Sequence, residues 1–250
     1  MPSEASESPS VNQDLAKKIA ENWRTVRDDV DEACRVAGRD PDAVRIIGVS
    51  KYVDAATTQH LIDAGCNDLG ENRPQVLWQK AETLRLPNHF RWHQIGHVQT
   101  NKVRRLLRHN PLIHSIDSEK LLVAISEEAA SQERDIEGLV EINISGESAK
   151  TGLMPEAARE LLAKLRREPE SIRHLRITGL MAMAGWKTSP EAAGQQFRQL
   201  ADLRGELQSV FDRELPELSM GMTGDFREAI AAGATMVRIG SALFPPELRG

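Results

Sequence analysis

The stretch RIIGVSKYV (residues 45–53) decides the fold, because a short apolar run rich in β-branched residues stops abruptly at Lys51. A run of this length and composition predicts a buried strand. An ammonium group is costly to bury without a partner, so Lys51 is expected where the strand reaches a polar end. Lys51 is then either the strand's exit into solvent or a reactive amine.

The same pattern, a short apolar run followed by an amphipathic segment, recurs along the chain. Eight runs are predicted as strands: VRIIGVS (44–50), CNDLG (66–70), FRWHQIG (90–96), LIHSI (112–116), LVEINIS (139–145), LRITGLMAM (175–183), ELSMGM (217–222) and MVRIGSALF (236–244). Seven segments between them are predicted as helices, near 54–64, 74–84, 98–108, 118–132, 155–167, 190–212 and 225–232. Strands that alternate with helices imply parallel pairing through crossovers.

Eight such units in 250 residues match the size of one closed barrel. The predicted fold class is α/β, a single-domain (β/α)₈ TIM barrel, with an open doubly wound sheet as the alternative. Apolar residues at helical spacing predict an additional N-terminal helix over 14–36. Only PPELRG remains after Phe244, so this helix is expected to fill the eighth place in the outer ring. The acidic, Ser-rich residues 1–12 are predicted to form a short disordered tail, and residues 13–250 the barrel domain.

The composition and the N-terminal sequence limit the classes of partner and the compartment that we expect for the protein. A net charge of −5 gives no electrostatic footprint for nucleic acid or an anionic membrane, and no apolar stretch approaches the length of a membrane span. The N-terminus lacks the basic and apolar regions of a signal peptide, which favours a cytoplasmic protein. Cys34 and Cys66 make no metal spacing and are predicted to pack in the core.

Chemistry in a parallel barrel gathers at the C-terminal ends of the strands, where Lys51 is expected. Arg238 lies mid-strand and alternation turns it into the barrel, where its guanidinium needs an acceptor. That acceptor is either a core carboxylate, Glu71 or Asp225, or an atom of a bound cofactor. Hydroxyls and close backbone approach in the last two strand ends suit a phosphate: Ser219, Met222, Thr223, Gly240 and Ser241. Lysine, arginine and phosphate loops together fit pyridoxal 5′-phosphate (PLP).

The chain resembles the pyridoxal phosphate homeostasis proteins, single-domain relatives of the alanine racemase N-terminal barrel. The resemblance is carried, in order, by GVSK (48–51), GEN (70–72), WHQIGHVQTNK (92–102), HSIDS (114–118), VEINISGESAKTGL (140–153), GLMAM (179–183), LSMGMTGD (218–225) and AIAAGATMVRIGSALF (229–244). The chain departs from the family at Arg73, Pro74 and the segment LFPPE.

The resemblance implies a role for each matching residue. Lys51 resembles the lysine that forms the internal aldimine with PLP, and Arg238 resembles the partner of the pyridine nitrogen. Asn72 resembles a contact at the side of the ring. The phosphate positions implied are Ser219, Gly240 and Ser241, with Thr223 nearby.

An arginine partner only donates hydrogen bonds, so it should leave the ring nitrogen unprotonated and the ring a weaker electron sink. A racemase also needs a second acid or base opposite the lysine. The only tyrosine, Tyr52, is expected by strand alternation to point away from Lys51, and His93, His97 and His114 are expected in structural or rim roles.

The residues predict a PLP-binding protein with no catalytic activity beyond aldimine formation. The resemblance implies that this protein acts in intracellular PLP homeostasis, where it buffers or delivers the cofactor. PLP-dependent apo-enzymes are the expected acceptors, and the protein is expected to be a monomer. The alternatives are a PLP-dependent amino-acid racemase or lyase, and a sugar-phosphate barrel enzyme without PLP.

Overall fold

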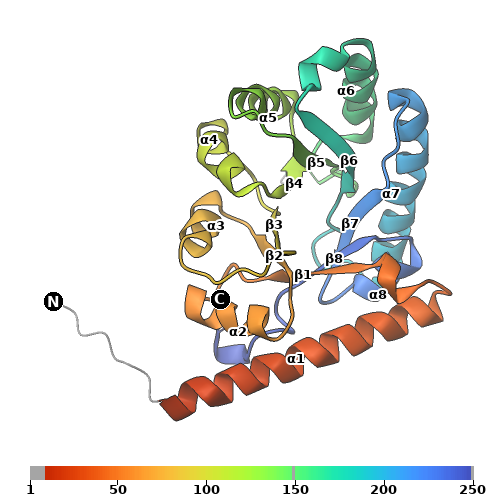
Figure 1. Cartoon of the computed structure of the whole chain (residues 1–250). Helices are drawn as coiled ribbons and strands as arrows, with labels where there is room; N and C mark the ends of the chain where they lie inside the picture. The colour runs from red at the N-terminus through yellow and green to blue at the C-terminus, as the bar shows by residue number, and fades with distance from the viewer. Residues whose placement is uncertain (1–8, 148–149, 249–250) are drawn as a thin grey trace.

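Eight parallel strands pair in chain order, and β8 pairs with β1, which closes the barrel. The computed structural model describes residues 9–147 and 150–248. Figure 1 shows the strands at the centre with the helices around them. The strands are β1 (Arg45–Val49), β2 (Asp68–Glu71), β3 (Arg91–Gln94), β4 (Leu112–Ile116), β5 (Ile136–Glu141), β6 (Leu175–Met181), β7 (Glu217–Met222) and β8 (Met236–Ile239). Closure confirms the predicted barrel and excludes the open sheet.

The helices of the outer ring follow the predicted order. They are α2 (Ala55–Asp63), α3 (Pro74–Ala81), α4 (Val103–Leu106), α5 (Glu119–Ser131), α6 (Pro155–Arg167), α7 (Pro190–Phe211) and α8 (Phe226–Ala231). Side chains cap three of them: Asp54, Ser118 and Ser189 each accept a hydrogen bond from a backbone N–H in the first turn of α2, α5 and α7.

The helix predicted near 98–108 is instead a series of short turns. A 3₁₀ turn over Thr100–Lys102 precedes α4, and a second one over Leu107–His109 follows it. Three-residue spacing of apolar positions suits 3₁₀ and α geometry alike, so periodicity alone does not separate them. No side chain caps these turns.

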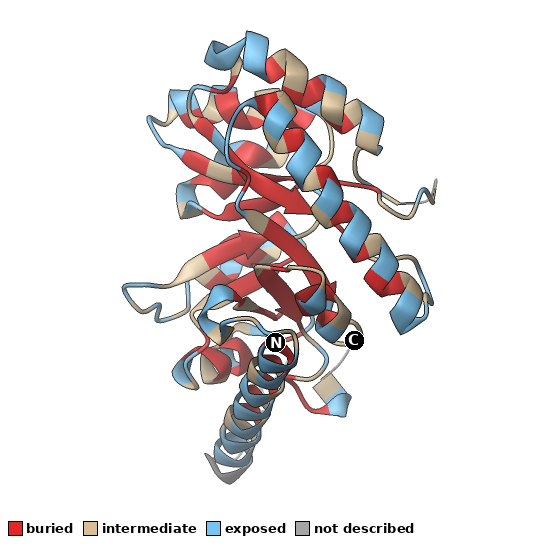
Figure 2. Ribbon diagram, turned by 90° about the vertical axis from the view of Figure 1, so that its right-hand side faces the viewer, coloured by how far each residue is buried: buried red, intermediate tan, exposed pale blue. Residues whose placement is uncertain are grey.

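The N-terminal helix α1 (Pro9–Val36) packs against α2 and α8, the place predicted for it in the outer ring. Its buried side chains, among them Ile19, Trp23 and Val30, face the barrel, and exposed residues follow its outer side (Figure 2). The helix begins at Pro9 rather than Asp14, so residues 9–12, assigned to the tail from the sequence, are helical. The remaining tail residues, 1–8, lie outside the described residues.

Two apolar clusters pack against the strands, one on the outer side of the barrel and one in its interior. The larger cluster fills the space between strands and helices, and a small one fills part of the interior with Ile47, Leu112, Leu139, Met181 and Met236. Cys34 and Cys66 are buried with free thiols, as expected, and burial raises the pKa of Cys66 to about 12. The strands carry almost only buried residues in Figure 2.

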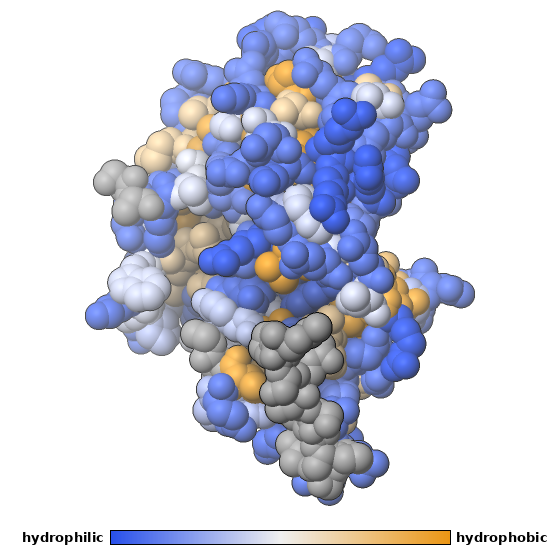
Figure 3. All heavy atoms as spheres, turned by 90° about the vertical axis from the view of Figure 1, so that its left-hand side faces the viewer, coloured by the Kyte–Doolittle hydropathy of each residue, from blue (hydrophilic) through white to orange (hydrophobic). Residues whose placement is uncertain are grey.

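Within residues 9–147 and 150–248, no helix combines the length and apolar character needed to cross a bilayer. The face shown in Figure 3 is largely hydrophilic, and apolar residues form only scattered patches on it.

Candidate functional site

A cavity of about 550 Å³ lies at the C-terminal mouth of the barrel. Seven of the eight predicted site residues line it: Lys51, Asn72, Met222, Thr223, Arg238, Gly240 and Ser241. The eighth, Ser219, does not. These residues come from the ends of β1, β2, β7 and β8, so closure of the barrel is what brings them together.

Lys51 follows β1 in a turn, and a buried ion pair contacts the residue just before it. The Nζ atom of Lys80 donates to the carbonyl of Ser50 at 2.8 Å and to Oε1 of Glu71 at 2.6 Å, and the Ser50 hydroxyl donates to the same Oε1 at 2.6 Å. Burial lowers the pKa of Lys80, and Glu71 opposes that shift. These three residues, Ser50, Glu71 and Lys80, are called the outer cluster below. They fix the backbone immediately before Lys51.

The expectation that Tyr52 points away from Lys51 is wrong. The Nζ atom of Lys51 lies 4.7 Å from the centre of the Tyr52 ring, and both side chains line the cavity. β1 ends at Val49, so the two-residue alternation of a strand no longer governs the turn that follows.

Arg238 points into the barrel as predicted, and its immediate partners are uncharged. Its Nη1 donates to the Ser219 hydroxyl at 2.7 Å, and its Nη2 donates to the carbonyl of Ala182 at 3.0 Å. Burial lowers the pKa of Arg238 to about 10, opposed by the more distant carboxylates of Asp225 and Glu141. Among the described residues no ion pair to Arg238 forms.

The two carboxylates considered as core partners of Arg238 lie elsewhere. Glu71 is bound to Lys80 on the outer side of β2. The Asp225 carboxylate accepts a hydrogen bond from the Met222 backbone N–H at 2.6 Å, inside its own loop. Arg238 therefore keeps donor capacity for the cavity that it lines.

Ser219 lies apart from the other predicted site residues, because it does not line the cavity. It was expected to contact a phosphate, yet its side chain is fully buried behind Arg238. Its hydroxyl lies 2.8 Å from Nδ1 of His114 and accepts a hydrogen bond from Arg238. Ser219 is in the middle of β7, whereas the residues that line the cavity come from the strand's last residue and the loop after it.

The loops after β7 and β8 form a small polar cradle at one side of the cavity. Gly221 has a positive φ of 89°, and a Cβ atom there would lie 2.5 Å from Cβ of Ala229, so only glycine fits this turn. The Thr223 hydroxyl accepts a hydrogen bond from the Gly240 backbone N–H at 3.3 Å, which links the two loops. Ser241 is exposed beside them.

Asn72 reaches the cavity from the end of β2. Its carbonyl accepts a hydrogen bond from the Gln94 side chain at 3.2 Å. A Cβ atom at Gly96 would lie only 2.4 Å from that carbonyl oxygen, so the close approach of the two strand ends requires glycine. The backbone of Asn72 is thus held against the end of β3.

Sequence reasoning missed Glu141, a buried carboxyl that lines the cavity from the end of β5, across the barrel from β1. The Thr151 hydroxyl donates to it at 2.5 Å, and burial raises its pKa against that hydrogen bond. The strand was predicted to run to Ser145, which made Glu141 look internal. Glu141 lies two residues after Leu139, so strand alternation turns both side chains toward the barrel interior. This pattern in the sequence could have identified Glu141.

The three histidines lie in the kinds of position expected. His93 and His114 are buried in the barrel interior, and burial lowers the pKa of both. His97 lies at the rim, lines the cavity and is bound to Asp117 through Nδ1 at 2.6 Å.

Known sequences and structures match this chain over most of its length. A sequence model of the family "Alanine racemase, N-terminal domain" matches residues 16–246. The pyridoxal phosphate homeostasis protein of Aquifex aeolicus is 37% identical over 224 residues, 90% of this chain and 96% of the relative. PipY of Synechococcus elongatus, solved with PLP bound, has a TM-score of 0.78 and 31% identity over 91% of this chain and all of PipY (100%).

A more distant structure shows the fold alone. The alanine racemase of Streptomyces coelicolor has a TM-score of 0.69 at 18% identity, and the match covers 91% of this chain and 58% of the racemase.

Proposed function

The chain belongs to the alanine racemase N-terminal domain family and, among the relatives it matches, to the pyridoxal phosphate homeostasis proteins; from this premise we propose that it binds PLP through Lys51 and acts in PLP homeostasis. The observation that carries the proposal is the convergence of Lys51, Arg238 and the loops after β7 and β8 on one cavity. A lysine, a donor-only cation and a polar cradle match the aldehyde, the ring nitrogen and the phosphate of PLP.

The residues present fit such a ligand. Arg238 is a buried guanidinium without a carboxylate bound to it among the described residues, so it retains donors for a ring nitrogen that carries a lone pair. Thr223, Gly240 and Ser241 offer hydroxyls and close backbone approach for a phosphate. Asn72 and Met222 line the cavity and would flank the ring.

PLP supplies an aldehyde that condenses reversibly with a primary amine, releasing water. Lys51 supplies that amine, and the outer cluster fixes the turn that carries it. Arg238 donates to the ring nitrogen and holds it unprotonated, because a guanidinium does not give up its proton at neutral pH. A ring that stays unprotonated is a weak electron sink, which disfavours transaminase-like chemistry and leaves open a racemase only where a second acid or base lies opposite the lysine.

We infer that PLP-dependent apo-enzymes are the acceptors of the bound cofactor. The support is chemical: a linkage that forms reversibly on a half-buried lysine at an open mouth can be exchanged for the lysine of another protein. Monomeric state and a cytoplasmic location stay predictions from the sequence.

The test is covalent trapping. The protein is incubated with PLP, reduced with borohydride, digested and mapped by mass spectrometry. We expect the adduct on Lys51, and Lys120→Ala, which removes an exposed lysine of α5, should leave the labelling unchanged. An adduct confined to any other lysine would overturn the proposal.

A second function is favoured by one observation, the buried Glu141 carboxyl on the far side of the cavity from β1. A racemase or lyase needs an acid or base across from the lysine, and Tyr52 packs beside the Lys51 amine rather than opposite it. Exchange of an amino acid's α-proton into deuterated water, lost in Glu141→Gln, would support an enzyme. If no amino acid in a broad panel exchanges its α-proton faster than with free PLP, the enzyme is rejected and the PLP-binding protein is the function that stands.

A further inference from the structure

A continuous chain of hydrogen bonds runs through the barrel interior and ends at Arg238. It begins at the start of β2, where Oδ1 of Asp68 lies 2.8 Å from Nε2 of His93, and Nδ1 of His93 lies 2.9 Å from Nε2 of His114. Nδ1 of His114 then lies 2.8 Å from the Ser219 hydroxyl, which Arg238 contacts at 2.7 Å. We call this set the relay: Asp68, His93, His114, Ser219 and Arg238.

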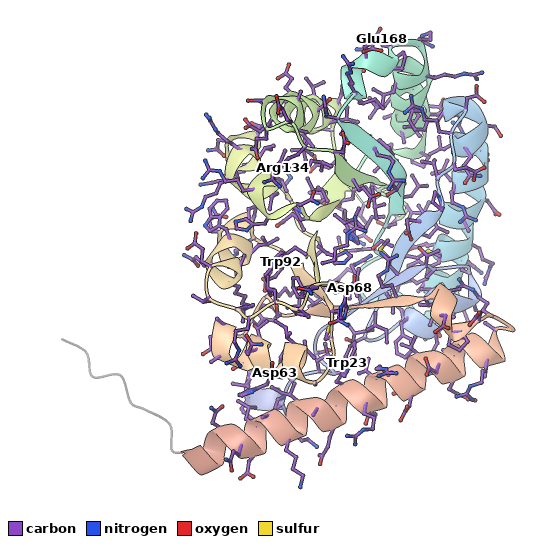
Figure 4. All side chains as sticks on the ribbon, in the orientation of Figure 1. Trp23, Asp63, Asp68, Trp92, Arg134 and Glu168 are labelled. Atoms are coloured by element: carbon purple, nitrogen blue, oxygen red, sulfur yellow. The ribbon has the colours of Figure 1, made fainter. Side chains whose placement is uncertain are left out.

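The relay spans the barrel from one end to the other. Asp68 is the first residue of β2, at the N-terminal end of the strands, and its side chain is 23% exposed, whereas Arg238 lines the cavity at the C-terminal mouth. In Figure 4 Asp68 lies among the central strands, away from the helical periphery where Glu168 and Arg134 lie. The three side chains between its ends are fully buried.

One end of the relay fixes the direction of every hydrogen bond in it. A carboxylate only accepts, so His93 must donate from Nε2. Burial lowers the pKa of both histidines, so each is neutral and carries one ring proton. His93 Nδ1 then accepts from His114 Nε2–H, and His114 Nδ1 accepts from the Ser219 hydroxyl. The Ser219 oxygen is left to accept from Arg238.

If the Asp68 carboxylate is removed, nothing imposes this order of donors and acceptors along the relay. The Ser219 oxygen has two lone pairs, so it can accept from Arg238 and from His114 Nδ1–H together. His114 can then exist in either tautomer, and the hydroxyl proton can turn elsewhere. The hydrogen bond that orients the guanidinium would then share its acceptor oxygen with a second donor.

We propose that Asp68 is a positioning residue for Arg238, acting through the three side chains between them to hold the guanidinium toward the ring nitrogen of the ligand. This proposal rests on the proposed function, because the ring nitrogen is that of PLP. It assigns a binding role to a carboxylate that does not line the cavity and lies at the other end of the barrel.

The first test needs no ligand. Nitrogen NMR of the protein labelled with ¹⁵N-histidine reports which ring nitrogen carries the proton. We expect the Nε2–H tautomer at both His93 and His114, and a mixture of tautomers at His114 in Asp68→Ala. Asp68→Asn retains an acceptor oxygen and should stay closer to wild type. Asp117→Ala removes the carboxylate bound to rim residue His97 and should leave both buried histidines unchanged.

The second test uses two ligands, PLP and its analogue with CH in place of the ring nitrogen. Asp68→Ala should weaken PLP binding roughly fivefold, the size of one hydrogen bond's net contribution, and leave the analogue's affinity unchanged. A role confined to stability would affect both ligands alike or neither, and that result would overturn the proposal. So would an unaltered His114 tautomer in Asp68→Ala. Failure of wild-type protein to bind PLP would instead count against the proposed function, and the NMR result would still decide the tautomers.

Discussion

The outer cluster and the relay are both buried, polar and adjacent to the cavity, but they are built differently. The outer cluster places an ion pair between the barrel wall and α3, with a backbone carbonyl and a hydroxyl as further partners. The relay separates its two charges by neutral groups inside the barrel. The first arrangement fixes the backbone before Lys51, and the second orients one side chain, Arg238.

This difference predicts where each cluster has its effect. Removing one half of a buried ion pair leaves an uncompensated charge, so the outer cluster should govern stability. Removing one hydrogen bond costs less than leaving a buried charge unpaired, so the relay should affect stability less than the outer cluster and should act also on ligand binding and on pH dependence.

The largest expected effect is that of Lys80→Met. It leaves the Glu71 carboxylate buried without its cation, and we expect a loss of roughly 3–5 kcal/mol in the free energy of unfolding, measured by urea denaturation. Lys120→Met, on the exposed face of α5, should change it by less than about 0.5 kcal/mol. Equal losses in the two variants would show that the ion pair contributes nothing specific.

The next effect is a dependence of stability on pH that comes from the relay histidines. Burial lowers the pKa of His93 and His114 in the folded state, so the unfolded chain takes up their protons first as the pH falls. Stability is therefore retained above about pH 6.5 and lost below it, by at most about 1.4 kcal/mol per pH unit for each histidine, until the pH reaches that histidine's lower pKa in the folded state. The groups that face this pair are Asp68, Ser219, Arg45, Arg91 and Arg238.

His93→Gln should reduce the dependence of the unfolding free energy on pH by the contribution of one histidine. Unfolding free energies of wild type and variant between pH 7.5 and about pH 5.5 measure the difference. Parallel pH profiles would contradict the assignment of a neutral buried histidine at this position.

An effect of similar size to that of the histidines is expected from Ser219→Ala, which removes the only hydroxyl in the relay. Leaving its buried partners unsatisfied should cost roughly 1–3 kcal/mol in unfolding free energy. Ser209→Ala removes an exposed hydroxyl that donates to a carbonyl within α7, and its effect should stay within about 0.5 kcal/mol. A Ser219→Ala protein as stable as the control would show that the relay does not depend on the serine.

Local patterns were sufficient for most of the architecture. The strands LIHSI and ELSMGM and the helix over 155–167 were predicted with the bounds that β4, β7 and α6 have. Counting the units predicted closure, and closure placed seven of the eight expected residues at one cavity.

The errors come from contacts and ends that local patterns do not determine. β5 and β8 end earlier than their apolar runs, because apolar residues continue to pack after the chain leaves the sheet, and Glu141 was hidden by this. Ser219 and His114 are 105 residues apart, and only the closed barrel brings them together. No periodicity in the sequence could have indicated that hydrogen bond.

The central claim is that the Lys51 amine holds PLP, and a spectrophotometric titration tests it most directly. Wild-type protein and Lys51→Ala are titrated with PLP and followed at visible wavelengths. We predict that wild type develops a saturable band that free PLP lacks, and that Lys51→Ala shows only the spectrum of free PLP. The same band in Lys51→Ala would contradict the claim.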